Sequence, residues 1–437
     1  MSPSNSKREI DASPTKSFFI ATLVKDIQLI DSILDLIDNS IDSYIENNLE
    51  GRRKISINFS ENKFEIEDNC GGIKKEDIYD KVFRFGLPKG SKEKTIGVFG
   101  IGMKRAIFKI GENILIESDD GKEYYSINIG KTWLTEEKNW KLVFKSEEKT
   151  KGKPMTKITI TELFENISQE LKNPKFENNL RERIKDSYSI FIDGRVDIET
   201  NNSPVDSYDF NFLYDEKNKF VPFHKNYKFG EVDVEIYAGY TPSVELNADK
   251  IYGWWIFCND RLVIKNDTTE KTGWGITADD EIKYHYPEDN RFLGLVFFRS
   301  DNAISLPWHT TKEDIQEDSR VYRQAQIEMK TVTKRFVDVI RIAGRTKDPD
   351  SGETIGKALF EDIASKPRKE IKKDLTEVLP ILKGIQVYKK YTYVTYVVPK
   401  ELVKKVKKKL GNAFMSNKEA GEKTFDYYVK MEDVENE

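Results

Sequence analysis

The feature that most constrains the fold is an acidic helix near the start of the sequence, where residues 35–43 read DLIDNSIDS. Apolar residues recur at helical spacing over residues 30–45, and the polar side chains fall within a wedge about 100° wide on another side. This wedge contains Asp31, Asp35, Asp38, Asn39 and Asp42. No Lys or Arg occurs between Asp26 and Gly51, so carboxylates four residues apart repel one another by about 0.2–0.5 kcal/mol a pair. Either a cation lies against this face or water solvates it.

The length and composition favour a folded chain of two or three domains. Its 437 residues are 38% hydrophobic, which is enough to form cores despite 33% charged residues. No apolar run approaches the roughly 20 residues of a membrane-spanning helix, and residues 1–16 lack the apolar centre of a secretory signal. We therefore expect a cytoplasmic protein with no membrane partner. Two cysteines, Cys70 and Cys258, cannot form a disulfide framework, and with three histidines they show no zinc-ligand spacing.

Shifts in pattern divide the chain into four parts. Residues 1–16 are a polar N-terminal strap, residues 17–168 read as one α/β unit, and residues 169–345 read as a second one. Residues 346–437 form a small basic C-terminal α/β region with an acidic tail, in which residues 366–410 carry 14 Lys or Arg against 4 Asp or Glu. The fold class is therefore α/β (α+β), and the last part is a candidate surface for an anionic partner.

Local patterns place several elements that bear on function. Helical spacing covers residues 17–48 with a brief break near Asp26, and apolar–polar alternation predicts a hairpin over residues 54–67. A third helix is expected over residues 101–110, and a fourth over residues 313–344.

A glycine-rich stretch leads into the third helix. Residues 96–106 read IGVFGIGMKRA, in which Gly97, Gly100 and Gly102 precede Lys104. Exposed N–H groups and the positive end of a helix dipole can cradle a phosphate, and glycine removes side chains that would block it. The order GxxGxGxK differs from the dinucleotide-binding GxGxxG and from a P-loop, which requires GK followed by Ser or Thr.

Four features in one order resemble the GHKL superfamily of ATPases. They are the acidic helix, EDNCGG at residues 67–72, IGVFGIGMKRA at residues 96–106 and MTKITITELF at residues 155–164. The superfamily shares the Bergerat fold and includes gyrase B subunits, MutL mismatch-repair proteins, MORC proteins and heat-shock chaperone ATPases. The resemblance covers about residues 17–165 and is closest in layout to the MutL/MORC type. It implies a Bergerat-type ATPase sandwich that binds ATP with Mg²⁺ and hydrolyses ATP to ADP and phosphate.

Under this resemblance the acidic helix becomes a catalytic and metal-binding element. Asn39 takes the position of the Mg²⁺ ligand. Asp35 takes the position of the base that polarises the attacking water, where the family usually has Glu. Mg²⁺ and the lysines that accompany a nucleotide would then be the cations expected against the acidic face.

The other three sequence features of the resemblance imply contacts to adenine and phosphate. Asp68 takes the position that accepts a hydrogen bond from the adenine amino group, with Gly72 closing the backbone around the base and Cys70 where Gly is usual. Thr156 takes the position of a Thr whose hydroxyl reaches that Asp, although TKITI is equally an ordinary alternating strand. The residues expected to bind ATP are Asn39, Asp42, Asp68, Gly72, Ile73, Lys89, Gly97, Val98, Phe99, Gly100, Ile101, Gly102, Met103, Lys104 and Thr156.

The second unit resembles the transducer domain that follows the ATPase in MutL-type and MORC-type proteins. The similar segments are GWWIFCNDRLVIK at residues 253–265 and LPWHTTKEDI at residues 306–315. In that family a loop lysine crosses back to the γ-phosphate, and Lys312 is the candidate for this catalytic role, with a purely surface role as the alternative. Arg261 is expected to form a structural ion pair rather than to bind a ligand.

The layout implies an ATP-dependent conformational switch that forms a homodimer when ATP is bound. Residues 13–20 would belong to the N-terminal strap through which such relatives dimerise. The basic helix KELVKKVKKKL at residues 400–410 would contact DNA in genome maintenance or defence, or is simply a solvated amphipathic helix. A separately encoded protein is the alternative partner to DNA. The alternative functions are a chaperone-like ATPase acting on protein clients and a low-turnover nucleotide-binding regulatory module.

Overall fold

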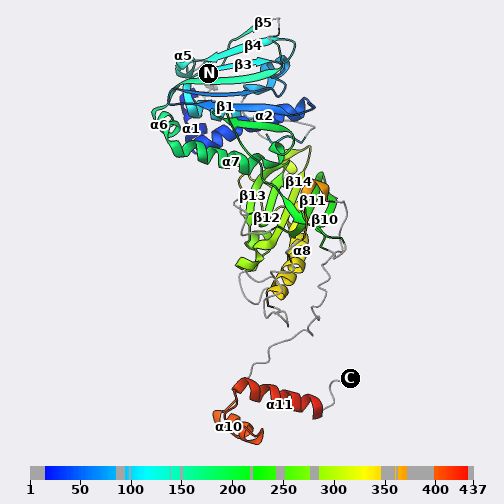
Figure 1. The fold of residues 1–437 in the computed structure, drawn as a ribbon. Coiled ribbons are helices and arrows are strands. Elements are labelled where there is room, and N and C mark those ends of the chain that lie inside the picture. The colour runs from blue at the N-terminus through cyan, green and yellow to red at the C-terminus, as the bar shows by residue number, and fades with distance from the viewer. Residues whose placement is uncertain are drawn as a thin grey trace, which may run out of the picture. The chain divides into compact units, whose positions relative to one another are not determined.

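The computed structural model describes residues 15–84, 94–97, 100–137, 139–147, 150, 152–216, 220–242, 251–275, 285–345, 360, 363–371 and 398–431 (Figure 1). The chain divides into two compact units, Met1–Ile381 and Leu382–Glu437, which are described separately.

The first unit contains both helices and strands, as the α/β (α+β) assignment requires. Those up to residue 204 are α1 (Lys16–Lys25), α2 (Leu29–Glu46), β1 (Arg53–Phe59), β2 (Lys63–Asp68), α3 (Lys75–Asp77), the π-helix η1 (Ile78–Val82), α4 (Gly102–Ile110), β3 (Gly111–Asp119), β4 (Tyr124–Ile129), α5 (Lys131–Thr135), β5 (Phe144–Glu147), β6 (Met155–Leu163), α6 (Glu165–Lys172), α7 (Pro174–Ile192), β7 (Val196–Thr200) and β8 (Ser203–Pro204). Those that follow are β9 (Asn211–Leu213), β10 (Phe223–Phe229), β11 (Val232–Tyr240), β12 (Gly253–Cys258), β13 (Arg261–Asp267), the 3-10 helices η2 (Glu270–Thr272) and η3 (Pro287–Arg291), β14 (Phe292–Arg299), η4 (Ala303–Ser305), α8 (Arg320–Arg345), β15 (Ser365–Pro367) and η5 (Arg368–Glu370).

An eight-stranded mixed sheet forms the N-terminal part, in the order β5-β4-β3-β6-β2-β1-β7-β8. The hairpin predicted over residues 54–67 is confirmed as β1 and β2, which pair antiparallel, whereas β1 and β7 pair parallel. Figure 1 shows α1, α6 and α7 on one side of this sheet. β7 and β8 extend the sheet beyond residue 168, where the sequence had placed the end of the first domain.

Helices α2, α4 and α7 form the layer that carries the site. Ile33, Ile37 and Ile41 recur every fourth residue of α2 and are fully buried, which explains why this segment is helical and which side faces the sheet. α2 packs on α4 and contacts α7. The predicted break near Asp26 is confirmed, since α1 ends at Lys25 and α2 begins at Leu29.

A five-stranded sheet forms the second half of the unit, in the order β10-β11-β14-β12-β13. Successive side chains of β12 point to opposite faces of the sheet. On one face the indole N–H of Trp254 donates a hydrogen bond to the Thr333 hydroxyl of α8, and on the other Trp255 belongs to a cluster of buried aromatic side chains. Gly294 of β14 pairs with Trp254 of β12. Glycine is needed there because a Cβ would lie 2.3 Å from the indole ring.

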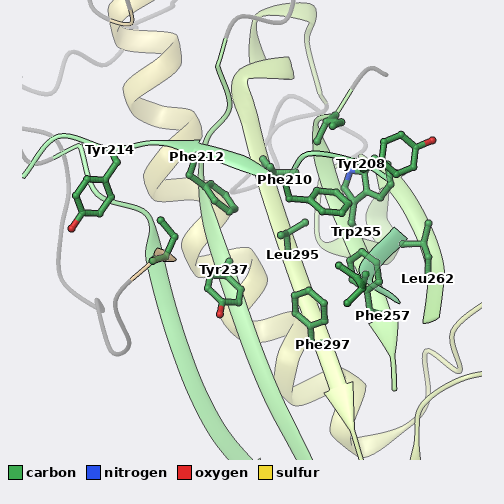
Figure 2. Close-up of a cluster of buried hydrophobic side chains, with 14 of the residues drawn as sticks. Tyr208, Phe210, Phe212, Tyr214, Tyr237, Trp255, Phe257, Leu262, Leu295 and Phe297 are labelled. Carbon is green, nitrogen blue, oxygen red and sulfur yellow. The ribbon is translucent and has the colours of Figure 1, made fainter. Parts of the chain in front are cut away.

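The face away from α8 is covered by an aromatic cluster (Figure 2). Phe210 precedes β9 and Phe212 lies within it. Phe210 packs on Trp255 and Phe257 of β12, and Phe212 packs on Tyr237 of β11. β15 pairs antiparallel with β9, so residues 365–367 pack with this part of the chain although the sequence had grouped them with the C-terminal region.

The predicted start of the helix at residue 313 is wrong, since α8 begins at Arg320. The preceding residues are held in a loop by a β-bridge between Trp308 and Ile315 and by a 2.6 Å ion pair between Lys271 and Asp314. These contacts compete with helix formation and shape the loop that carries Lys312.

The second unit contains two described helices, α10 (Lys400–Lys409) and α11 (Asn417–Met431). The helix predicted at residues 400–410 is confirmed. The described residues include no helix with the length and apolarity needed to cross a membrane.

Candidate functional site

The acidic face of α2 is buried, which contradicts the alternative of a solvated face. Asp35, Asp38 and Asp42 are 7%, 2% and 1% exposed, and Asn39 is the exposed polar residue among them. Burying three carboxylates is costly unless each is paired. The structure supplies a different partner for each one.

Asp38 is held by two cations from the second half of the chain. Lys312 Nζ lies 2.7 Å from Asp38 Oδ2, and Arg261 Nε lies 3.0 Å from Asp38 Oδ1. Tyr188 of α7 also donates its hydroxyl to Oδ1, at 2.7 Å. Burial alone would raise the pKa of Asp38, but the two cations and the hydroxyl outweigh it and hold that pKa below its usual value. The residue is therefore ionised at neutral pH.

Asp35 pairs within its own domain. Arg105 of α4 donates from Nε to Asp35 Oδ2 at 2.6 Å. The other oxygen faces the start of α4, because a Cβ added to Gly102 would lie 3.4 Å from Asp35 Oδ1. Glycine at position 102 therefore keeps open the space between this carboxylate and the helix N-terminus.

Asp42 anchors the beginning of the glycine loop. The N–H groups of Ile96 and Gly97 donate to its carboxylate at 2.6 and 2.9 Å. Gly100 has a φ of +62°, which favours glycine, and no side chain caps α4, whose N-cap is Ile101. Gly102, one of the glycines predicted to cradle phosphate, thus lies beside Asp35. Lys89, Val98 and Phe99 lie outside the described residues.

Lys104 is placed differently from the expected phosphate contact. Its ammonium donates to the carbonyl oxygens of Val82 and Arg84, both at 2.8 Å, and burial lowers its pKa to about 8. Met103 is buried beside it. The basic residue that α4 directs to the acidic helix is the next one, Arg105.

Asp68 is the last residue of β2, and its carboxylate is buried among polar groups. Ser40 donates to its Oδ2 at 2.7 Å, and the Cys70 N–H donates to its Oδ1 at 2.8 Å. Burial raises its pKa to about 6 despite these two hydrogen bonds. Thr156 is the residue opposite Asp68 in the β2–β6 pair, and its hydroxyl lies 3.1 Å from Ser118 Oγ.

The backbone after Asp68 approaches β3 closely. Gly72 has a φ of +69°, and a Cβ there would lie 2.0 Å from the carbonyl oxygen of Asp119, so no side chain fits. The N–H of Ile73 donates to Ser118 Oγ at 2.9 Å. Ser118 therefore joins Ile73 to Thr156, two residues that the sequence predicts to bind ATP.

Lys312 sits in a strained loop. Its φ of +60° is in the left-handed region, which costs a non-glycine residue about 1–3 kcal/mol. Its N–H donates to the His309 carbonyl at 2.9 Å, and its own carbonyl accepts from Arg261 at 3.0 Å. The loop thus directs the lysine side chain onto α2, to the residue before Asn39.

The residues present suit a magnesium nucleotide. Asn39 Nδ2 donates to the Asp35 carbonyl at 2.5 Å, so its amide oxygen is the atom available as a metal ligand. Among the described residues no group of three or more His, Cys, Asp or Glu could hold a metal ion. Mg²⁺ commonly takes one or two protein oxygens and completes its shell with phosphate and water, which this donor set allows.

Sequence reasoning missed five residues of the site, namely Asp38 as an ion-pair partner, Ser40, Arg105, Ser118 and Tyr188. Ser40 and Arg105 adjoin residues that were identified, and a helical wheel could have found them. Tyr188 acts from 150 residues away, so no local pattern indicates it.

Comparison with known families supports the same region. Residues 27–164 match the family model described as histidine kinase-, DNA gyrase B-, and HSP90-like ATPase. The match begins just before α2 and ends just after β6, so it includes the three carboxylates of α2, the glycine loop and Asp68. A search of curated proteins found no match.

Proposed function

Residues 27–164 form a GHKL-type ATPase domain, and we propose that the whole chain is a Mg²⁺-dependent ATP-hydrolysing conformational switch of the MutL/MORC type. The observation that carries this proposal is the 2.7 Å contact between Lys312 of the second half and Asp38 of α2. A lysine that reaches the acidic helix from another part of the chain can respond to the nucleotide there. Transducer-like organisation of residues 169–345 is part of the proposal.

The chain's own residues divide the work of binding and catalysis. Asp68 and the Gly72 backbone would hold adenine, the glycine loop and the α4 N-terminus would hold phosphates, and Asn39 would hold Mg²⁺. Bound Mg²⁺ neutralises phosphate charge. Asp35, whose second oxygen faces the cradle, would accept the proton of the attacking water, with Lys312 stabilising charge at the γ-phosphate.

Exchange of Lys312 between two anions would provide the switch. The Lys312 ammonium pairs with Asp38 at 2.7 Å, and a γ-phosphate would offer a competing anion. ATP and ADP would then favour different positions of the Lys312 loop, because only a difference in affinity can shift such a population.

Lys312→Ala is expected to lower the turnover number by about 10²–10³-fold while leaving ADP affinity nearly unchanged, because the lysine would meet only the γ-phosphate. Steady-state hydrolysis and calorimetry with ADP measure the two quantities. The control is Lys330→Ala, an α8 lysine for which no role at the site is proposed. Full turnover in Lys312→Ala would remove the lysine from catalysis, and lack of nucleotide uptake by the folded wild type would reject the proposed function.

ATP affinity is expected to fall as the pH drops through about 6, where burial places the pKa of Asp68. Protonation removes the charge that strengthens a hydrogen bond from the adenine amino group. The free energy of unfolding changes in the opposite direction to ATP affinity. Because the pKa of Asp68 is raised in the folded chain, protonated Asp68 stabilises the fold fully below its unfolded pKa, and this stabilisation is lost as the pH rises through about 6. Calorimetry across this range tests the expected loss of affinity. Asp68→Asn is the control because it keeps the titration of the nucleotide's own phosphate and removes that of Asp68, so identical pH profiles in the two proteins would contradict the prediction.

A low-turnover regulatory module is the second candidate, and the Arg105–Asp35 ion pair favours it. A carboxylate engaged by a guanidinium at 2.6 Å has to release it, or use its other oxygen, to accept a proton from water. Under this reading nucleotide binding would be retained with little hydrolysis.

Action on DNA is proposed for the C-terminal unit, together with ATP-dependent homodimerisation through the strap. α10 carries six lysines and one glutamate, a charge that suits a phosphate backbone. Lys16 is buried and donates to the carbonyls of Trp133 and Asn139, which fixes the start of α1 on its own domain. The homodimer proposed here would therefore leave Lys16 on its own subunit. Repeating the hydrolysis assay with duplex DNA separates this proposal, which expects stimulation, from chaperone-like action. The sequence also offers Tyr388, Tyr391, Tyr393 and Tyr396, either for stacking on bases or as ordinary strand residues, and all four lie outside the described residues.

A further inference from the structure

The turn between β12 and β13 is unusual for a hairpin tip because it is buried. Asn259, Asp260 and Arg261 are 3%, 5% and 5% exposed. Asn259 and Asp260 have φ values of +45° and +65°, as a two-residue type I′ turn requires. Three consecutive buried polar side chains are costly unless each finds partners. Here each one contacts a different part of the chain.

Asn259 holds the start of the glycine loop. Its Nδ2 donates to the Thr95 carbonyl at 2.8 Å and to the Ser300 carbonyl at 3.0 Å, while its Oδ1 accepts from the Ser300 N–H at 2.9 Å. The next two residues after Thr95 are those whose N–H groups donate to Asp42. Residues 95–97 are therefore fixed on one side by α2 and on the other by this turn.

Asp260 fixes the turn itself. Arg299 at the end of β14 and Arg195 after α7 each donate to its carboxylate at 2.6 Å. These cations hold the pKa of Asp260 below its usual value although burial opposes them. The turn is thus bound both to its own sheet and to the segment that leads into β7.

Arg261 fixes the other wall of the site. Its Nε donates to Asp38 and its Nη1 to the Lys312 carbonyl, both at 3.0 Å. It therefore sets the position of the carboxylate that receives Lys312 and of the loop from which Lys312 extends. A plain hairpin tip needs neither contact.

We propose that Asn259 and Arg261 are positioning residues for the γ-phosphate, one holding the glycine loop and the other holding Lys312 and Asp38. Because they are two residues apart in one rigid turn, the loop and the lysine move together with the second sheet. The inference rests on the proposed ATPase function and goes beyond it by assigning the coupling to a single turn. Neither residue needs to touch the nucleotide.

The test compares an ATP analogue with ADP. Asn259→Gly keeps a left-handed backbone accessible and removes the bond to Thr95 together with the two bonds to Ser300. Its dissociation constant for the β,γ-imido analogue of ATP, with Mg²⁺, is expected to rise about tenfold, and that for ADP much less. The control is Asn266→Gly, which replaces another asparagine of positive φ at the far end of the same hairpin and should leave both constants unchanged. Thermal unfolding of each variant identifies any general loss of stability.

A second variant tests the other wall. Arg261→Lys keeps a cation near Asp38 but cannot reproduce two separate donors, so it should lower the turnover number about fivefold with ADP affinity retained. Arg261→Lys made in the Lys312→Ala variant should lower the turnover number little further, because both substitutions act through the Lys312 side chain. Additive losses would overturn the role of Arg261.

The outcomes distinguish this inference from the proposed function. A wild type that binds nucleotide, together with an Asn259→Gly variant whose two affinities fall by the same factor or not at all, would overturn the inference alone. A folded wild type that binds no adenine nucleotide would overturn both. A selective loss for the ATP analogue would support the inference, since a purely structural defect lowers both affinities.

Discussion

Asp38→Ala is expected to lower the free energy of unfolding by about 3–5 kcal/mol, because it leaves two buried cations without their carboxylate. The side chains of Arg261 and Lys312 are 6% and 12% exposed, so water cannot replace the lost partner. Tyr188 loses an acceptor as well. Urea denaturation of wild type and variant measures the difference.

The control is a surface pair of similar geometry. Arg52 and Asp197 lie 2.6 Å apart, but their side chains are 47% and 59% exposed. Removing this carboxylate with Asp197→Ala should cost only about 0–1 kcal/mol, since water solvates the arginine that remains. Equal losses in the two variants would show that the Asp38 network is not desolvated as its burial indicates.

Acid should weaken the same network. Because the pKa of Asp38 is lowered in the folded chain, its stabilising contribution is complete above the unfolded value of about 3.8 and is lost as the pH falls through the folded value. Asp38→Asn, which keeps the size but not the charge, should therefore be less stable than wild type at neutral pH, with the difference shrinking in acid.

Periodicity predicted the elements around the site because their signals are local. The spacing of Ile33, Ile37 and Ile41 marks α2, and alternation marks the β1–β2 hairpin. The acidic wedge was visible for the same reason. The expectation that cations lie against this face was also correct, and those that the structure shows are Arg105, Arg261 and Lys312 of the chain itself.

The partners of the wedge could not be read from the sequence. Arg261 and Lys312 lie 223 and 274 residues from Asp38, and nothing in the local pattern records which of 71 basic residues the fold will bring back. The resemblance did point to Lys312 through the loop that carries it. It gave no role to Arg105, although successive residues of a helix point about 100° apart and only one of Lys104 and Arg105 can face α2.

Loss of hydrolysis without loss of binding is expected for Asp35→Asn. The turnover number should fall about 10²–10⁴-fold, the usual contribution of a general base. Asparagine is nearly isosteric with aspartate, so the space beside Gly102 and the cradle should persist, and affinity for the imido analogue should be unchanged or tighter. Calorimetry and a hydrolysis assay on the same preparation give both values.

Asn39→Ala is the contrasting variant on the same helix. It removes the amide oxygen proposed to ligate Mg²⁺, so it should abolish the Mg²⁺-dependent part of nucleotide affinity, whereas binding measured with a chelator present should match wild type. Equal loss of binding in Asp35→Asn and Asn39→Ala would reject Asp35 as the base.

Arg105→Gln decides between an ATP-hydrolysing switch and a low-turnover regulatory module, because it frees Asp35 from its ion pair. The turnover number should rise if the ion pair restrains an active base. Hydrolysis should remain negligible if the domain only binds nucleotide.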